Sequence, residues 1–108
     1  MISVTITTEG KNLALRLTGH AGYAEHGKDI VCASASILAH ALAQIVSAVE
    51  RRGELASPAE IRLESGDTLI SCEPGEDTLD AMIGAYYFAK TGYALLAHNY
   101  PQYVRLMP

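Results

Sequence analysis

The segment from Ile30 to about Arg51 constrains the fold most, because it is long and has the periodicity of an amphipathic α-helix. Asp29 precedes it and is a residue type that commonly caps helix N-termini. A helix of this kind buries its apolar face against another layer of the domain. The residues expected on that buried face are Ile30, Ile37, Leu38, Ala41, Leu42, Ile45 and Val49.

Short alternating segments on both sides of this helix predict two β-hairpins. Apolar and polar residues alternate over 2–7 and again over 13–18, with a Glu-Gly-Lys-Asn turn between the two runs. The strand-like runs 59–63 and 68–72 flank a Ser-Gly-Asp turn and predict the second hairpin. The alternation in the first hairpin indicates one buried face, which suits a sheet covered on one side.

A second helix is predicted after Asp77, which we interpret as its cap, and Pro101 ends it. Residues 103–106 predict a last edge strand. The order ββαββα(β) therefore predicts one domain over residues 1–108, an α+β two-layer sandwich with two helices on one face of a mainly antiparallel sheet. The apolar face expected on the second helix consists of Leu79, Met82, Ile83, Tyr86, Ala89, Tyr93 and Leu96.

Composition limits the classes of function. The chain has 108 residues and a net charge of −4, and 49% of its residues are hydrophobic, which is typical of a globular domain. The acidic balance argues against a general nucleic-acid binder, so we expect no direct nucleic-acid binding. We expect no signal peptide and no apolar run able to span a membrane. Two cysteines make no disulfide framework, so both thiols are expected to be reduced, in the cytosol.

The residues that carry the chemistry lie where the first helix begins. His20 ends the second predicted strand, and Cys32 falls at about the third helical position, away from the expected buried stripe. The helix dipole favours a thiolate there, and a nearby imidazole can take the proton of the thiol. Backbone N–H groups around Cys32 are the expected donors to an oxyanion. These are the parts of a cysteine hydrolase.

Three other histidines compete with His20 for the role of the base. His40 lies on the same helix as Cys32, roughly 12 Å further along the axis at about 1.5 Å per residue, which is too far for contact. His98 lies near the end of the second helix, where a surface position is expected. His26 lies in the middle of a loop, whereas His20 ends a strand. A base must be held in place, which favours His20.

Asp29, Ser36 and Cys72 each have a structural interpretation. Asp29 either only caps the helix or orients a histidine. Ser36 lies one turn after Cys32, as a solvated polar residue or as a hydrogen-bond partner of the histidine or of a substrate carbonyl. Cys72 belongs to a predicted strand and is interpreted as structural. His20 and Cys32 give two metal ligands, fewer than zinc requires, and there is no CxxC pair, so no metal or cofactor is expected.

The segment GHAGYAEHGKDIVCASAS, with the opening MISVTI and the closing YVRL, resembles the ribosomal-processing cysteine protease family over essentially the full chain. The resemblance implies a small α+β homodimer that acts as an endopeptidase in the bacterial cytoplasm. The implied substrate is a large-subunit ribosomal protein with a short N-terminal extension, which is removed for ribosome assembly. A net charge of −4 suits a basic partner of this kind.

The resemblance also implies roles for individual residues. Cys32 matches the nucleophile and His20 the general base, and Asp29 and Ser36 are candidate catalytic helpers. Residues 21–28 correspond to a mobile loop that covers the bound peptide. An alternative function is a binding module that grips a ribosomal protein during assembly without cutting it. The candidate residues of the substrate loop are Gly19, Ala21, Gly22 and Gly27.

Overall fold

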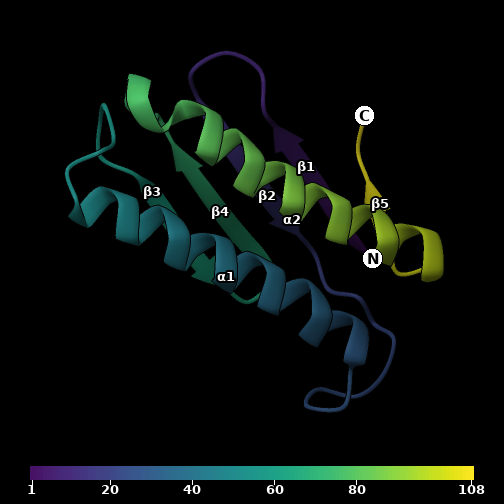
Figure 1. Ribbon diagram of the computed structural model, residues 1–108. Helices are drawn as coiled ribbons and strands as arrows, with labels where there is room; N and C mark the ends of the chain where they lie inside the picture. Colours follow the sequence, from purple (N-terminus) through teal and green to yellow (C-terminus); the bar gives the residue numbers. More distant parts are fainter.

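Two long helices cover one face of a five-stranded sheet in the computed structural model, which describes residues 1–108 (Figure 1). The strands are β1 (Ile2–Thr7), β2 (Leu13–Thr18), β3 (Glu60–Glu64), β4 (Asp67–Cys72) and β5 (Val104–Leu106). The helices are α1 (Ile30–Arg51), the short 3-10 helix η1 (Glu76–Thr78) and α2 (Leu79–Asn99). The predicted α+β sandwich and its order of elements are confirmed.

The sheet is open and mostly antiparallel, with the strand order β3-β4-β2-β1-β5. Only β5 runs parallel to its neighbour, β1. Strand β2 lies at the centre and pairs with β1 and β4, so that Leu15 is opposite both Ile6 and Ile70. Leu13, Leu15 and Leu17 are all buried, because alternate side chains of β2 point to the same face of the sheet. This apolar face is the one that the helices cover.

Helix α1 has the predicted bounds but buries a different face. Ile30, Ile37 and Ile45 of the expected stripe are exposed, at 53%, 65% and 44% respectively. The helix is apolar on most sides, so apolar character alone does not identify the side that packs. Small side chains decide the matter, because alanines let the helix backbone approach the sheet closely. The buried residues of α1 are Val31, Ala35, Ala39, Leu42, Ala43, Val46 and Val49.

Two buried tyrosines attach α2 to the rest of the core. The Tyr86 hydroxyl donates to the Ile70 carbonyl oxygen of β4 (3.0 Å), and the Tyr93 hydroxyl donates to the Ala35 carbonyl oxygen of α1 (2.8 Å). Burial raises the pKa of both phenols, as expected for groups whose charged form has lost its water. Cys72 is buried beside the Tyr86 hydroxyl, with burial raising the pKa of its thiol, which agrees with a structural role.

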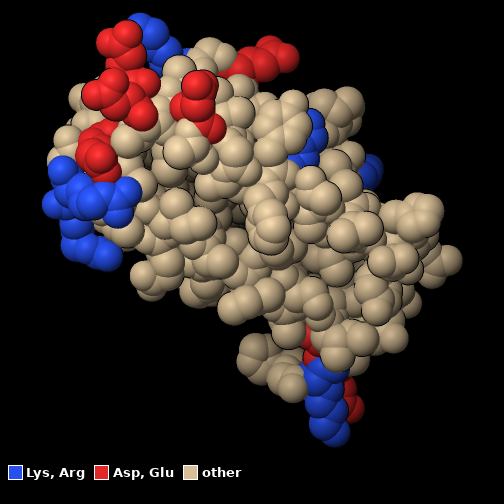
Figure 2. Space-filling view, in the orientation of Figure 1, with Lys and Arg blue, Asp and Glu red and all other residues tan.

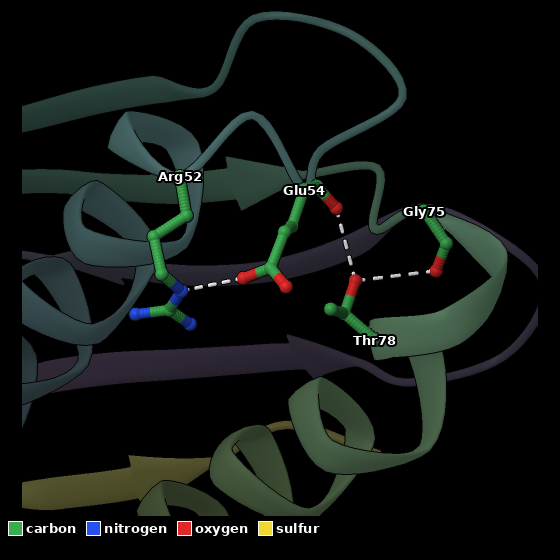
Figure 3. Close-up of polar contacts among 4 residues, drawn as sticks. All are labelled: Arg52, Glu54, Gly75 and Thr78. Atoms are coloured by element: carbon green, nitrogen blue, oxygen red, sulfur yellow. Dashed lines mark hydrogen bonds and ion pairs between the residues drawn. The ribbon is translucent and has the colours of Figure 1, made fainter.

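The start of α2 differs from the prediction that Asp77 caps it. Asp77 lies within η1, and Thr78 occupies the cap position without a side-chain cap hydrogen bond. The Thr78 hydroxyl instead donates to the carbonyl oxygens of Glu54 (2.9 Å) and Gly75 (3.2 Å), which ties α2 to the chain that follows α1 (Figure 3). Arg52 and Glu54 form an exposed ion pair beside this contact.

Helix α1 is long and apolar enough to span a membrane by length and composition, contrary to the expectation from the sequence. It contacts both α2 and β4 through its buried face. The core helix of a two-layer domain has the same length and composition, so these two properties do not identify a membrane segment.

Asp29 fixes the beginning of α1. Its Oδ1 accepts a hydrogen bond from the Cys32 backbone N–H (2.9 Å), which makes it the predicted N-cap. Its Oδ2 accepts from the backbone N–H groups of Tyr23 (3.0 Å) and Ala24 (3.3 Å) in the preceding loop. Burial acts to raise the pKa of Asp29, but the backbone hydrogen bonds outweigh it and hold the pKa below its ordinary value of 3.8.

We expect Asp29→Ala to lower the free energy of unfolding by about 1 kcal/mol at pH 7, as is typical for loss of an N-cap. A lowered folded-state pKa stabilises the fold above the unfolded value of 3.8, and this contribution disappears as the pH falls through the folded value. The difference in the free energy of unfolding between Asp29→Ala and the unmodified chain should therefore narrow as the pH falls below 3.8. Urea unfolding at pH 7 and pH 3 measures it.

Asp77→Ala is the control for this experiment, because Asp77 is exposed and makes no cap hydrogen bond. Its unfolding free energy should stay within about 0.5 kcal/mol of the original. Equal losses in the two variants, or a loss at Asp29 that does not change with pH, would contradict the role given to this carboxylate.

Candidate active site

Two hollows meet around Cys32, and four residues line both of them. The first, of about 520 Å³, lies between the loop before α1 and the first turns of the helix. The second, of about 260 Å³, lies between α1, the end of β2 and the turn from β3 to β4. The residues common to both hollows are His20, His26, Cys32 and Ser36. The two residues expected to carry the chemistry are therefore neighbours of the same space.

Cys32 is half-buried and lies at the third position of α1, as predicted. The thiol is a free cysteine and lies at the N-terminal, positive end of the helix dipole. The N–H groups expected to bind an oxyanion are already engaged: Cys32 N–H donates to the Asp29 carboxylate, and Ala33 N–H donates to the Asp29 carbonyl oxygen (3.0 Å). The expectation that backbone N–H groups near Cys32 bind an oxyanion stays a prediction, and it would require these two groups to exchange their present acceptors.

His20 follows the end of β2, and its imidazole lies against the turn between β3 and β4. A Cβ atom placed on Gly66 of that turn would be 2.7 Å from His20 Nε2. The Gly19 N–H also donates to the Gly66 carbonyl oxygen (3.0 Å), and the His20 carbonyl oxygen accepts from the Met1 nitrogen. No hydrogen bond joins Cys32 Sγ to the His20 ring in this structure. Catalytic hydrogen bonds often tighten only when substrate binds.

The other histidines are distributed as follows. His26 lines both hollows from the loop, so it shares the space of His20 and Cys32. His40 lines only the second hollow, and its Nδ1 is hydrogen-bonded to the Ser36 carbonyl oxygen (2.8 Å). His98 lines neither hollow.

The two candidate helpers are both beside the thiol. Ser36 lines the same hollows as Cys32, and its hydroxyl makes no hydrogen bond within the protein. Asp29 lines the first hollow, but its carboxylate oxygens bind backbone N–H groups and no histidine. The catalytic part assigned to each of them stays a prediction.

The loop before α1 carries the four predicted substrate-loop residues. Ala21, Gly22 and Gly27 line the first hollow, and Gly19 lines the second. Gly22 and Gly27 have φ values of 70° and 87°, in the left-handed region that favours glycine. Ala21 is only 3% exposed and belongs to the core, so it anchors the loop rather than forming its free part.

Two contacts of this region were not predicted from the sequence. The Tyr23 ring packs edge-on against Tyr100 and Tyr103, with ring centroids 5.6 Å and 5.2 Å apart. Gly66 forms the surface under His20. Both contacts join segments far apart in the chain, and the only available signal was that Gly66 belongs to a turn. No group of three or more His, Cys, Asp or Glu side chains is placed to hold a metal ion.

Comparison with solved structures supports the same fold. Prp from S. aureus, in complex with a covalently linked product peptide, matches with a TM-score of 0.71 and 23% identity, over 98% of this chain and 97% of that chain. The same protease with a substrate peptide matches at 0.66 and 22%, over 99% and 98%. SMU.848 from Streptococcus mutans matches at 0.66 and 26%, over 98% and 91%.

A search of curated proteins found no significant match. The model of the family described as cysteine protease Prp, however, matches residues 1–105, which is nearly the whole chain. That span includes both hollows and every residue named in the site. The chain therefore belongs to the cysteine protease Prp family.

Proposed function

We propose that this chain is a Cys–His endopeptidase of the bacterial cytoplasm that removes the N-terminal extension of a large-subunit ribosomal protein during ribosome assembly. The observation that carries the proposal is that Cys32 and His20 line the same two hollows, in a member of a cysteine protease family. The S. aureus relative is described as a ribosomal processing protease and was solved with a substrate peptide. Two free thiols suit a reducing compartment.

In the proposed reaction, His20 accepts the proton of the Cys32 thiol, and the thiolate attacks the scissile carbonyl carbon. The tetrahedral intermediate collapses to a thioester, and protonated His20 gives its proton to the leaving amine. Water, deprotonated by His20, then hydrolyses the thioester and restores the thiol. Peptide binding would bring the two side chains into hydrogen-bond contact, since none joins them in the free protein.

Oxyanion stabilisation needs donors other than the engaged N–H groups of Cys32 and Ala33. The Ser36 hydroxyl is one such group, because it lines both hollows and has no partner in the protein. A donor is useful there only if it lies near the oxygen on which negative charge develops. This makes Ser36 the first of the two candidate helpers to substitute.

We expect the unmodified protein to trim the precursor of the ribosomal protein at one site in its N-terminal extension, and Cys32→Ala to lose this activity entirely. Intact mass of the precursor after incubation measures the cleavage. Cys72→Ala is the matched control, because Cys72 is a buried residue of β4 and lines neither hollow. It should still cleave. Cleavage by Cys32→Ala would refute the proposed nucleophile.

The second candidate function is a binding module that holds the ribosomal protein without cutting it. Binding alone requires neither a thiol at a helix start nor an imidazole in the same hollow, so the site favours the protease. Tight binding of the precursor with no cleavage by any variant would support the module instead.

We also propose that the protein acts as a homodimer through the outer face of its two helices. Residues 30–49 of α1 contain no Asp, Glu, Lys or Arg, and Figure 2 shows few charged side chains across the middle of this face. Phe88 and Leu95 of α2 are 77% and 59% exposed, and Ile37 of α1 is 65% exposed. A large exposed apolar surface is typical of a protein–protein interface.

We expect Phe88→Asp to convert the dimer into a monomer, because it would bury an unpaired charge in the proposed interface. Sedimentation velocity over a range of protein concentrations measures the change. Met107→Asp is a suitable control, since Met107 is also exposed but follows β5, outside the helices. A monomeric unmodified protein, or dimers that persist in Phe88→Asp, would contradict this interface.

A further inference from the structure

We propose that Gly66 is a positioning residue for the base, in that the turn between β3 and β4 provides the surface that holds the His20 imidazole in the hollow that Cys32 also lines. This inference rests on the proposed function, because it assigns His20 to the reaction. Gly66 takes no chemical part in the mechanism above and acts only through the His20 ring that lies against it.

The His20 ring lies very close to the backbone of the turn. A Cβ on Gly66 would lie 2.7 Å from His20 Nε2, 3.1 Å from Cε1 and 3.5 Å from Cδ2. Side-chain carbons do not approach other heavy atoms as closely as 2.7 Å, so any residue larger than glycine would displace either the ring or the turn. The tip of the imidazole therefore occupies the space that a side chain at position 66 would fill.

The backbone beside His20 is connected to the same turn. The Gly66 carbonyl oxygen accepts a hydrogen bond from Gly19 N–H, one residue before His20, and Thr18 pairs with Asp67 in the sheet. The backbone next to His20 and the His20 ring are thus both held against one turn. The same turn lines the second hollow, which Cys32 of α1 also lines.

Gly10 separates the effect of backbone conformation from that of close contact. Gly10 lies in the turn between β1 and β2 with a φ of 74°, the same value as Gly66. An alanine at either position would suffer the same left-handed backbone strain. A Cβ on Gly10 would meet no atom within 4 Å, whereas one on Gly66 would meet the imidazole. The two substitutions therefore differ mainly in what they do to His20.

The experiment compares Gly66→Ala with Gly10→Ala in the full chain. The probe is a peptide that spans the junction between the extension and the mature ribosomal protein, and urea unfolding is measured in parallel. Both variants should lose similar stability. Gly66→Ala should lose at least tenfold in kcat/KM, mainly through kcat, while Gly10→Ala stays within twofold of the unmodified protein.

Alkylation of Cys32 by iodoacetamide gives a readout that needs no peptide. The rate is measured against pH in both glycine variants and in His20→Ala, on a Cys72→Ala background that leaves Cys32 as the only thiol. The acid limb of the profile should change in Gly66→Ala, toward the profile of His20→Ala, and should be unchanged in Gly10→Ala. A merely structural loss of stability would not alter this limb.

Unchanged or increased kcat/KM in Gly66→Ala, or equal losses in both glycine variants, would overturn the inference. Failure of the proposed function would look different, since the unmodified protein would then leave the peptide intact. In that case the alkylation profile decides: a change confined to Gly66→Ala supports the placement of His20 by this turn, and identical profiles in the two glycine variants overturn it.

Discussion

The antiparallel pairing of β2 with β4 is the constraint on which the site depends. It joins the first hairpin to the second, although the whole of α1 lies between them in the chain. Its register places Asp67 opposite Thr18, so the turn of the second hairpin ends beside the residue that follows β2. The chain between β2 and β3 contains α1, which therefore packs over the apolar face of the sheet. His20, Cys32 and the turn between β3 and β4 lie close together because this pairing brings the second hairpin back beside β2, with α1 packed over the sheet.

Asp29 is the second residue that organises the site. One carboxylate holds the first turn of α1 and the middle of the preceding loop, so the thiol and the wall of the first hollow are fixed together. The arrangement has a chemical consequence, because the N–H of Cys32 is satisfied by a charged acceptor in the free protein. The helix dipole still acts on the thiol, whereas direct N–H donation to a bound carbonyl oxygen would require this contact to change.

Local patterns in the sequence were sufficient for much of the fold. Alternation predicted both hairpins, and the cap at Asp29 placed Cys32 correctly within its helix. The buried face of α1 was predicted wrongly, because its three isoleucines share a face that stays exposed, whereas packing selected the side with Ala35 and Ala39. The contact of the His20 ring with Gly66 could not be predicted either, since Gly66 is distant in sequence and glycine is common in turns. The roles of Cys32 and His20 came from resemblance, and their spacing alone was not specific.

The contact of Tyr23 with Tyr100 and Tyr103 has a consequence for how the protein is made. The ring belongs to the loop beside the thiol, but both of its partners follow α2 and are synthesised much later than the loop. The first hairpin and α1 are complete long before these partners leave the ribosome, and contacts between distant segments close late in folding. Synthesis of the segment after α2 is thus coupled to ordering of the loop, and a polypeptide that has not yet reached this segment would carry the thiol without the Tyr23 contacts of the loop beside it.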